Sequence, residues 1–392
     1  MTETMMNRRD FCFSVTGLSA LAANASVPTG RTGSRSVAAP SGVIGEGPFT
    51  ERIDIPKSWR RAGIVLQRSL EGPGSSVIGD PCIVRDDDID GWRMFLFFDP
   101  PGCGQAVCPG GLDAGPGHWK MEGALVFANP SDISGGSTHK PFIVMEADHP
   151  NQAARIDGRF WLLTVSWRAG HKVVQRSWAE KLSGPWTVQP EPLISHGDGS
   201  DFDAKHADAV TGFHFPERGE ILYYYMGYPE RPQPRSISPL GNAQAAAVQR
   251  IGEDRARKLG EMLPPCQTDG HWASGWVGGL QILPGKTHRW IAAINASPTA
   301  PGRESAEVFR EEPPPSLGGF AFCDEEWPVR GWKWMPEPIE RIEDIPPQAA
   351  ALGEGFNLWR QHILVLPEGS MALFYNSGFY GREQLFMKIA GK

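Results

Sequence analysis

Two strand-like runs joined by a turn signal occupy residues 82–98, which are Cys82-Ile83-Val84-Arg85-Asp86-Asp87-Asp88-Ile89-Asp90-Gly91-Trp92-Arg93-Met94-Phe95-Leu96-Phe97-Phe98. The runs Cys82–Val84 and Trp92–Phe98 are rich in β-branched and aromatic side chains, which favour strands. Asp90-Gly91 between them is a strong signal for a tight hairpin turn. This stretch therefore predicts a β-hairpin.

The hairpin pattern recurs four more times along the chain. The other turns are Asp157-Gly158, Pro216-Glu217-Arg218-Gly219, Pro284-Gly285-Lys286 and Pro367-Glu368-Gly369-Ser370, each between two apolar runs. The innermost strands of the five units are expected to begin near Asp80, Asp148, Asp208, Trp276 and Trp359, at intervals of 60 to 83 residues. Such an interval has room for the four strands of a propeller blade and its loops.

Five such units favour one all-β domain, a five-bladed β-propeller over residues 60–392. A single blade cannot bury both of its faces, whereas five blades arranged radially bury each face against a neighbour. Gly63–Leu70 would supply the outer part of the last blade and close the ring. Arg255–Leu263 has a helical pattern and is expected in a loop of the third blade. A two-sheet sandwich and a six-bladed propeller are the alternative folds.

The composition excludes several classes of protein. The 392 residues include 46 Gly and 35 Pro, which a coiled coil or helical solenoid could not carry. The formal net charge of −7, from 38 Lys+Arg and 45 Asp+Glu, is opposite to the charge that nucleic-acid binding requires. The 14 Trp residues suit either a β-rich core or stacking against sugar rings.

The N-terminal segment resembles a twin-arginine export signal. Arg8-Arg9 precede the short apolar stretch Phe11–Ala25, which ends in the small-residue pattern Ala23-Asn24-Ala25. We therefore expect a signal peptide at residues 1–25, a flexible leader at residues 26–59, the Tat translocase as a partner in export, and a periplasmic or secreted location. No run of 18 uninterrupted apolar residues predicts a membrane span.

The cysteines give no sign of a metal site or a disulfide framework. Cys12 would be removed with the signal peptide, which leaves five, an odd number without metal-ligand spacing. Cys103 and Cys108 could close a short loop, but most of the five are expected to be free.

Two pieces of sequence carry a resemblance to a known group of enzymes. Gly79-Asp80-Pro81-Cys82-Ile83-Val84 stands before the first hairpin, and Ser177 leads through Leu182 to Gly184-Pro185-Trp186. This pattern resembles the five-bladed glycoside hydrolases of families 43, 62, 32, 68, 117 and 130, over roughly residues 60–390. The resemblance implies a sugar-binding funnel at the propeller axis, lined by carboxylates from the starts of several innermost strands.

Cleavage of a glycosidic bond requires a proton donor at the leaving oxygen and a base or nucleophile on the opposite face of the sugar. The resemblance implies that Asp80 is the general base. In the cluster Asp201–Asp208, strand alternation would place His206 and Asp208 together on the axial side, so either is a candidate acid or a group that tunes the acid. Glu354 in the fifth unit is a second candidate acid.

Other residues are candidates for binding the substrate. Asp148 could orient the sugar, and Trp276 and Trp359 could stack on it. His362 is similar to the central-channel His of several of these families, and family 117 is understood to use a His as its acid. Further candidates are Arg360, Asn376 and Arg382, of which Arg382 could pair with Glu383 or bind the carboxylate of an acidic sugar.

The sequence thus predicts an exported glycoside hydrolase, with two alternatives. One is a non-catalytic carbohydrate-binding propeller; the other is a glycoside phosphorylase, which would need Arg or Lys at the axis, such as Arg360 and Arg382. No phosphate-loop, dinucleotide or His-Glu-x-x-His pattern indicates a cofactor or catalytic zinc. A structural Ca²⁺ in the axial channel is conceivable, although no loop signature supports it.

Overall fold

The computed structural model describes residues 52–69, 72, 74, 76–100, 102–110, 118–199, 201–230, 242–268, 270–298, 316–354, 358–366, 370–378 and 382–390. All of them belong to one compact unit, residues 51–392. The expected signal peptide, residues 26–51 of the expected leader and residues 367–369 of the fifth predicted turn lie outside the described residues. Ile53, at the end of that leader, is buried and forms a parallel β-bridge with Gly285. The folded unit therefore begins several residues before residue 60.

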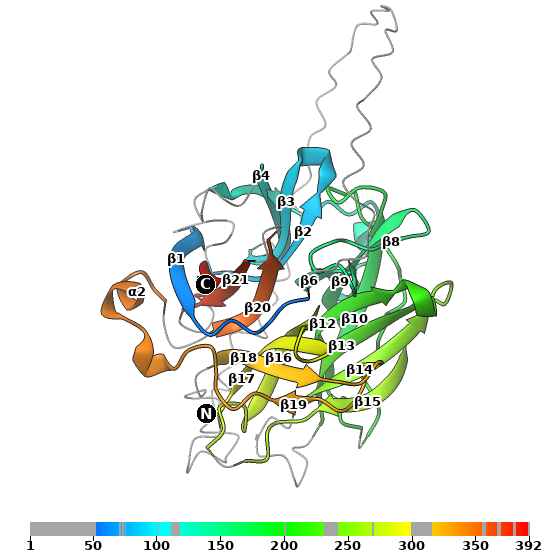
Figure 1. Cartoon of the computed structure of the whole chain (residues 1–392). Coiled ribbons are helices and arrows are strands. Elements are labelled where there is room, and N and C mark those ends of the chain that lie inside the picture. The colour runs from blue at the N-terminus through cyan, green and yellow to red at the C-terminus, as the bar shows by residue number, and fades with distance from the viewer. Residues whose placement is uncertain are drawn as a thin grey trace, which may run out of the picture. The chain divides into compact units, whose positions relative to one another are not determined.

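The unit is a five-bladed β-propeller of antiparallel blades, as the sequence predicts (Figure 1). From the axis outward, the strands are β2 (Val77–Asp86), β3 (Gly91–Asp99), β4 (Gly102–Pro109) and β5 (Lys120–Ala124) in blade 1; β6 (His139–Ile143), β9 (Arg159–Arg168), β10 (His171–Ala179) and β11 (Thr187–Val188) in blade 2; β12 (His206–Phe215), β13 (Glu220–Tyr228), β14 (Ala243–Arg250) and β15 (Arg257–Leu263) in blade 3; β16 (Trp276–Pro284), β17 (Trp290–Ser297), β18 (Leu317–Cys323) and β19 (Lys333–Trp334) in blade 4; and β20 (Leu358–Val365), β21 (Met371–Ser377), β22 (Gln384–Ala390) and β1 (Trp59–Leu66) in blade 5.

The five innermost strands form a closed ring. Each of β2, β6, β12, β16 and β20 contacts the next, and β20 contacts β2. Blade 5 is completed by the N-terminal strand β1, which pairs antiparallel with the C-terminal strand β22 from Trp59↔Ala390 to Leu66↔Leu385. Figure 1 shows β1 in blue beside the C-terminus. The predicted closure by the segment around Gly63 is confirmed.

Two expectations about elements are wrong. The innermost strand of blade 2 is β6, and the segment around Asp148 instead forms a turn between the two-residue strands β7 (Met145–Glu146) and β8 (Arg155–Ile156). Residues 257–263 form the outermost strand β15 of blade 3 and not a helical loop segment, because β15 pairs along β14 from Gln244↔Leu263 to Val248↔Arg257. The described α-helix is the short α2 (Pro347–Ala351).

The core fills the spaces between neighbouring blades. One cluster of buried apolar side chains runs from blade 1 through blade 4, and a second joins blades 5 and 1. Tyr223, Tyr224 and Tyr225 of β13 are all fully buried.

Among the described helices, none has the length and apolarity that crossing a bilayer would demand.

Every innermost strand carries a β-bulge near its start. Register shifts lie between Gly79 and Cys82, His139 and Phe142, Asp208 and Thr211, Val277 and Leu280, and Trp359 and His362. Four residues in these bulges have a left-handed backbone, with φ of 53° at Asp80, 50° at Lys140, 48° at Ala209 and 34° at Arg360. Bulges redirect side chains, and non-glycine residues at positive φ concentrate at functional sites. This ring of bulges, which we call the bulge ring, defines one axial end of the propeller.

Candidate functional site

Four of the five bulges bring charged side chains to the axial end of the propeller. Asp80 comes from β2, Lys140 from β6, Asp208 from β12 and Arg360 from β20. Blade 4 contributes the uncharged pair Gly278-Gly279 at the equivalent place. The site is therefore a ring of alternating carboxylates and cations, to which blade 4 adds no charge.

Asp208 is the most strongly paired residue of this ring. Its side chain is 1% exposed, with Oδ1 2.6 Å from Lys140 Nζ and Oδ2 3.0 Å from Lys172 Nζ on β10. The Ala209 N–H also donates to Asp208 Oδ1 over 2.7 Å. Burial favours the neutral acid, but the two lysines outweigh it and hold the pKa of Asp208 well below its usual value. Asp208 is therefore a fixed anion, not a proton donor at neutral pH.

Lys140 of this site has a pKa lowered toward the physiological range. Burial of its ammonium group lowers the pKa of Lys140 to about 8, with Lys172 adding to the decrease and Asp208 and Asp80 opposing it. The side chain nevertheless keeps about a fifth of its surface exposed. Lys140 can thus exchange a proton with a bound molecule or with water in the physiological range.

The Asp80 side chain is partly exposed, and its position is fixed through a hydrogen bond of the Asp80 backbone. The Asp80 N–H donates to Asn376 Oδ1 of β21 over 3.2 Å. A Cβ on Gly79 would lie 2.6 Å from Asn376 Nδ2, so only glycine fits before Asp80. Asn376 is itself buried, which makes it a residue that positions Asp80 and not a surface for substrate.

Arg360 crosses from blade 5 to blade 3. Its side chain passes over Gly279, whose missing Cβ would lie 3.2 Å from Arg360 Nε, and its Nη2 donates to the Val210 carbonyl over 2.7 Å. The residue is 7% exposed, and Nη1 contacts no acceptor among the described residues. Arg360 therefore brings a buried positive charge to the bulge that carries Asp208.

Lys172 contacts both His206 and Asp208, the first with its backbone and the second with its side chain. His206 Nδ1 accepts the Lys172 backbone N–H over 3.1 Å, and the His206 ring packs edge-on against Trp167. Burial and then the Lys172 charge lower the pKa of His206 to about 3. The imidazole is therefore neutral and offers no acidic proton at neutral pH.

The two tryptophans of the site stack on each other. The rings of Trp276 and Trp359 are 5.2 Å apart at an interplanar angle of 18°. Trp276 is buried, whereas Trp359 is partly exposed. The structure therefore places Trp276 and Trp359 as one stacked pair, and a role of either in sugar stacking stays a prediction.

Asp148 does not join the site. It is exposed in a turn next to β7, and β7 pairs with the far end of β12, where the Ala147 N–H donates to the His214 carbonyl. His214 and Asp208 are six positions apart in β12, which corresponds to roughly 20 Å in an extended strand. Asp148 therefore lies apart from the bulge ring and does not converge with Asp80 and Asp208.

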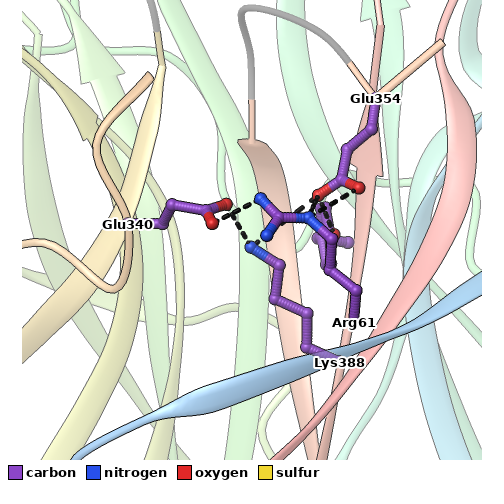
Figure 2. Close-up of polar contacts among 5 residues, drawn as sticks. Arg61, Glu340, Glu354 and Lys388 are labelled. Carbon is purple, nitrogen blue, oxygen red and sulfur yellow. Dashed lines mark hydrogen bonds and ion pairs between the residues drawn. The ribbon is translucent and has the colours of Figure 1, made fainter. Parts of the chain in front are cut away.

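Glu354 belongs to a different cluster, shown in Figure 2. Its carboxylate accepts from Arg61 Nε at 3.1 Å and from the Tyr375 hydroxyl at 2.6 Å, and Lys388 lies 3.7 Å away. Arg61 and Lys388 also pair with Glu340. These residues, which we call the clasp, fasten β1 and β22 to the connection between blades 4 and 5. Glu354 is therefore tied into this cluster and does not join the bulge ring.

His362 and Arg382 are also not placed to contact a substrate at the ring. His362 is 1% exposed, and its Nε2 lies 3.1 Å from Asn151 Nδ2 and 3.4 Å from the Ile83 nitrogen. Arg382 is exposed in the segment before β22, whereas its neighbour Glu383 is fully buried. His362 is a core residue, and Arg382 is a surface residue of blade 5.

Sequence reasoning missed Lys140 and Lys172. One signal was available: His139-Lys140-Pro141-Phe142-Ile143-Val144 repeats the pattern of Gly79-Asp80-Pro81-Cys82-Ile83-Val84, with a charged residue before proline and an apolar run. That repeat marks β6 as the counterpart of β2.

Among the described residues, no group of three or more His, Cys, Asp or Glu could hold a metal ion. The five described cysteines, including Cys103 and Cys108, are free thiols.

Comparison with known proteins gives the fold a context. No family model and no curated protein matches the sequence. The structure of BT0996 in an RGII complex is similar, with a TM-score of 0.64 and 12% identity over 86% of this chain and 93% of that protein. A thermostable family-43 glycoside hydrolase has a TM-score of 0.55 and 13% identity over 81% and 89%. A member of the family 130 mannoside phosphorylases, described as containing hydrolases of β-1,2 mannosidic linkages in Candida mannan, has a TM-score of 0.58 and 14% identity over 86% and 96%.

Proposed function

We propose that this protein is an enzyme that cleaves glycosidic bonds, with Asp80 as the general base. The observation that carries the proposal is the partly exposed Asp80 carboxylate, held at a φ of 53° by the bulge of β2 beside Lys140. Such a strained backbone persists where the surrounding structure fixes it, and it is typical of functional sites. The fold shared with solved glycoside hydrolases supports the same reaction class.

Lys140 is the proposed proton donor. Asp80 would take a proton from the water that attacks the anomeric carbon, while the Lys140 ammonium protonates the leaving oxygen as the C–O bond breaks. Asp80 then holds one proton more and Lys140 one fewer, and exchange with solvent restores both. Asp208 holds the Lys140 ammonium group in place, and with a pKa near 8 that group is mostly protonated at pH 7.

The test distinguishes three effects: loss of the general base Asp80, loss of the proton donor Lys140, and a change of charge at the site. The substrate comes from a screen of the mature protein against aryl glycosides and plant, algal and bacterial polysaccharides. Asp80→Asn should lose about 10²- to 10⁴-fold in rate while sugar affinity persists. Lys140→Arg keeps the charge but does not release its proton, because the arginine pKa exceeds 12. It should lose rate on natural glycosides and recover on nitrophenyl glycosides, whose leaving group hardly needs protonation.

Lys205→Arg is the matched control for Lys140→Arg, because Lys205 is an exposed lysine directly before β12, the strand that carries Asp208. It should leave the rates unchanged. Full activity of Asp80→Asn would eliminate the mechanism. Equal losses for Lys140→Arg on substrates with good and poor leaving groups would remove Lys140 as the donor while leaving Asp80 in its role.

A non-catalytic carbohydrate-binding propeller is the second candidate function. The observation in its favour is that Asp208 is committed to two lysines, so Asp80 is the one carboxylate of the bulge ring that remains partly exposed. In that case Asp80→Asn would change sugar affinity alone, with no turnover to lose.

We also propose export by the twin-arginine route, which the Arg8-Arg9 pattern supports.

A further inference from the structure

We infer that the axial end binds a negatively charged group of the substrate, a carboxylate borne by the sugar, through Lys172 and Arg360. The inference rests on the proposed function for its placement at the reacting sugar. It names the class of substrate, an acidic glycoside, that the proposed reaction would use.

The first support is the local charge. The bulge ring holds the cations Lys140 and Arg360 and the carboxylates Asp80 and Asp208. Lys172, which pairs with Asp208 from β10, adds a third cation, so cations outnumber carboxylates by three to two. This excess of positive charge stands in a chain whose formal net charge is −7. A cationic site in an acidic protein favours an anionic ligand.

The second support is the geometry around Asp208. The buried carboxylate holds the ammonium groups of Lys140 and Lys172 on its two oxygens, so two like charges lie close together. Each ammonium has three N–H donors, and the two side chains keep 20% and 23% of their surface exposed. An oxyanion beside them would accept the remaining N–H groups and relieve the repulsion.

The third support is Arg360, which is independent of the lysines. It is more than nine-tenths buried, yet its Nη1 has no acceptor among the described residues. Leaving a buried charged donor without a partner is costly, whereas a guanidinium matches a carboxylate through two parallel hydrogen bonds. Because Arg360 Nη2 already binds the Val210 carbonyl in the Asp208 bulge, Nη1 lies in the same neighbourhood.

A tryptophan borders the bulge that carries Arg360. Trp359 directly precedes Arg360 in β20 and is the partly exposed member of the tryptophan stack. A sugar that carries a carboxylate combines a ring face, which can pack on an indole, with a charge, which a guanidinium can hold. Inorganic phosphate is the other oxyanion that these cations could hold.

Binding of small probes tests the inference without requiring turnover. Isothermal titration calorimetry would compare glucuronate and galacturonate with glucose and galactose, and separately measure inorganic phosphate, at low and high salt. We expect at least a tenfold preference for the acidic sugars that weakens with salt. Lys172→Met should abolish the preference, Lys172→Arg should retain it, and the exposed control Lys205→Met should leave it intact.

Arg360→Met removes the guanidinium, and Arg360→Lys is a second variant in case Arg360→Met fails to fold. Arg360→Lys should weaken the binding of acidic sugars by about tenfold without affecting the binding of neutral sugars. Phosphate binding that depends on Lys172 and Arg360, without a preference for uronates, would overturn the inference of a sugar carboxylate, because free phosphate would then be the bound oxyanion, and it would favour phosphorolysis. Equal binding of acidic and neutral sugars together with no phosphate binding would overturn the inference. Uronate binding in a protein that hydrolyses no glycoside would contradict the proposed function and leave the inference standing.

Discussion

At the scale of single residues, backbone strain and not composition marks the site. Asp80, Lys140 and Arg360 are charged residues with positive φ, a conformation that L-residues adopt at a cost of about 1–3 kcal/mol each. Asp80 is predictable from the Gly-Asp-Pro string. Lys140 escapes prediction because its strand follows no tight turn signal, and its importance comes from a pairing with Asp208 across two blades.

His362 shows how a residue can be correctly placed near the axis and wrongly assigned a role. Its Nε2 accepts from the Asn151 amide, which requires a neutral ring, and burial followed by the Arg360 charge lowers the pKa of His362 to about 3. Above pH 6.5 the ring is neutral in both the folded and unfolded states. Below that pH only the unfolded state takes up the proton, so stability falls as the pH decreases toward 3.

We expect this one group to contribute a loss of about 1.4 kcal/mol of unfolding free energy per pH unit between about pH 6 and pH 4. Urea unfolding at several pH values would compare the wild type with His362→Gln, whose side chain does not titrate. The pH slope of the variant should be shallower by that amount, although the variant is less stable at pH 7. The exposed His118→Gln serves as control, and identical slopes for wild type and His362→Gln would refute the assignment.

At the scale of elements, the sequence predicted those strands that adjoin a tight turn. The hairpins at Asp90-Gly91 and Pro216–Gly219 join the two inner strands of their blades. In blade 2, Asp157-Gly158 instead joins β8 to β9, and β6 reaches β9 across the insertion 144–158. Strand β15 escaped prediction because it is an outer strand with irregular register and mixed exposure, which gives no clean alternation.

The clasp should stabilise the closing strand β1 without affecting catalysis. Glu354→Gln would leave Lys388, 2% exposed, and Arg61 facing a neutral amide. Removing one partner of a buried ion pair costs about 3–5 kcal/mol when the other charge is left alone. Because Glu340 still pairs with both cations and Arg61 is partly exposed, we expect a smaller loss of about 2 kcal/mol. Denaturant unfolding measures this loss, and the rate per folded molecule should remain unchanged.

The matched control for the clasp is Glu337→Gln, which removes an exposed ion pair with Arg341 in the same connection. A surface pair of this kind contributes about 0–1 kcal/mol. A loss of turnover in folded Glu354→Gln would restore Glu354 as a catalytic candidate. A stability equal to that of the control would show that the clasp does not hold β1.

At the scale of the whole molecule, ring closure joins the two ends of the folded unit. Because β1 pairs with β22, blade 5 is complete only when these two strands, which lie far apart in the sequence, have come together. The site draws on strands from blades 1, 2, 3 and 5, so it too forms only in the closed ring. The repeat of five hairpins made the architecture predictable. The charged-residue-proline pattern shared by β2 and β6 could have marked Lys140, but the pairing of Lys140 and Lys172 with Asp208 joins strands of two blades and cannot be read from that pattern.

We predict that the protein is exported as a closed, folded molecule. The twin-arginine route carries folded proteins, and the five described cysteines are free, which is consistent with folding in a reducing compartment before translocation. Changing Arg8 and Arg9 together to Lys keeps the charge of the segment but should leave the precursor in the cytoplasm. Cell fractionation with immunoblotting would follow precursor and mature protein, and the expected mature chain begins near Ser26. Changing Arg31 and Arg35 to Lys, in the segment after the cleavage site, should not alter export, and unchanged export of the Arg8/Arg9 variant would contradict the proposed route.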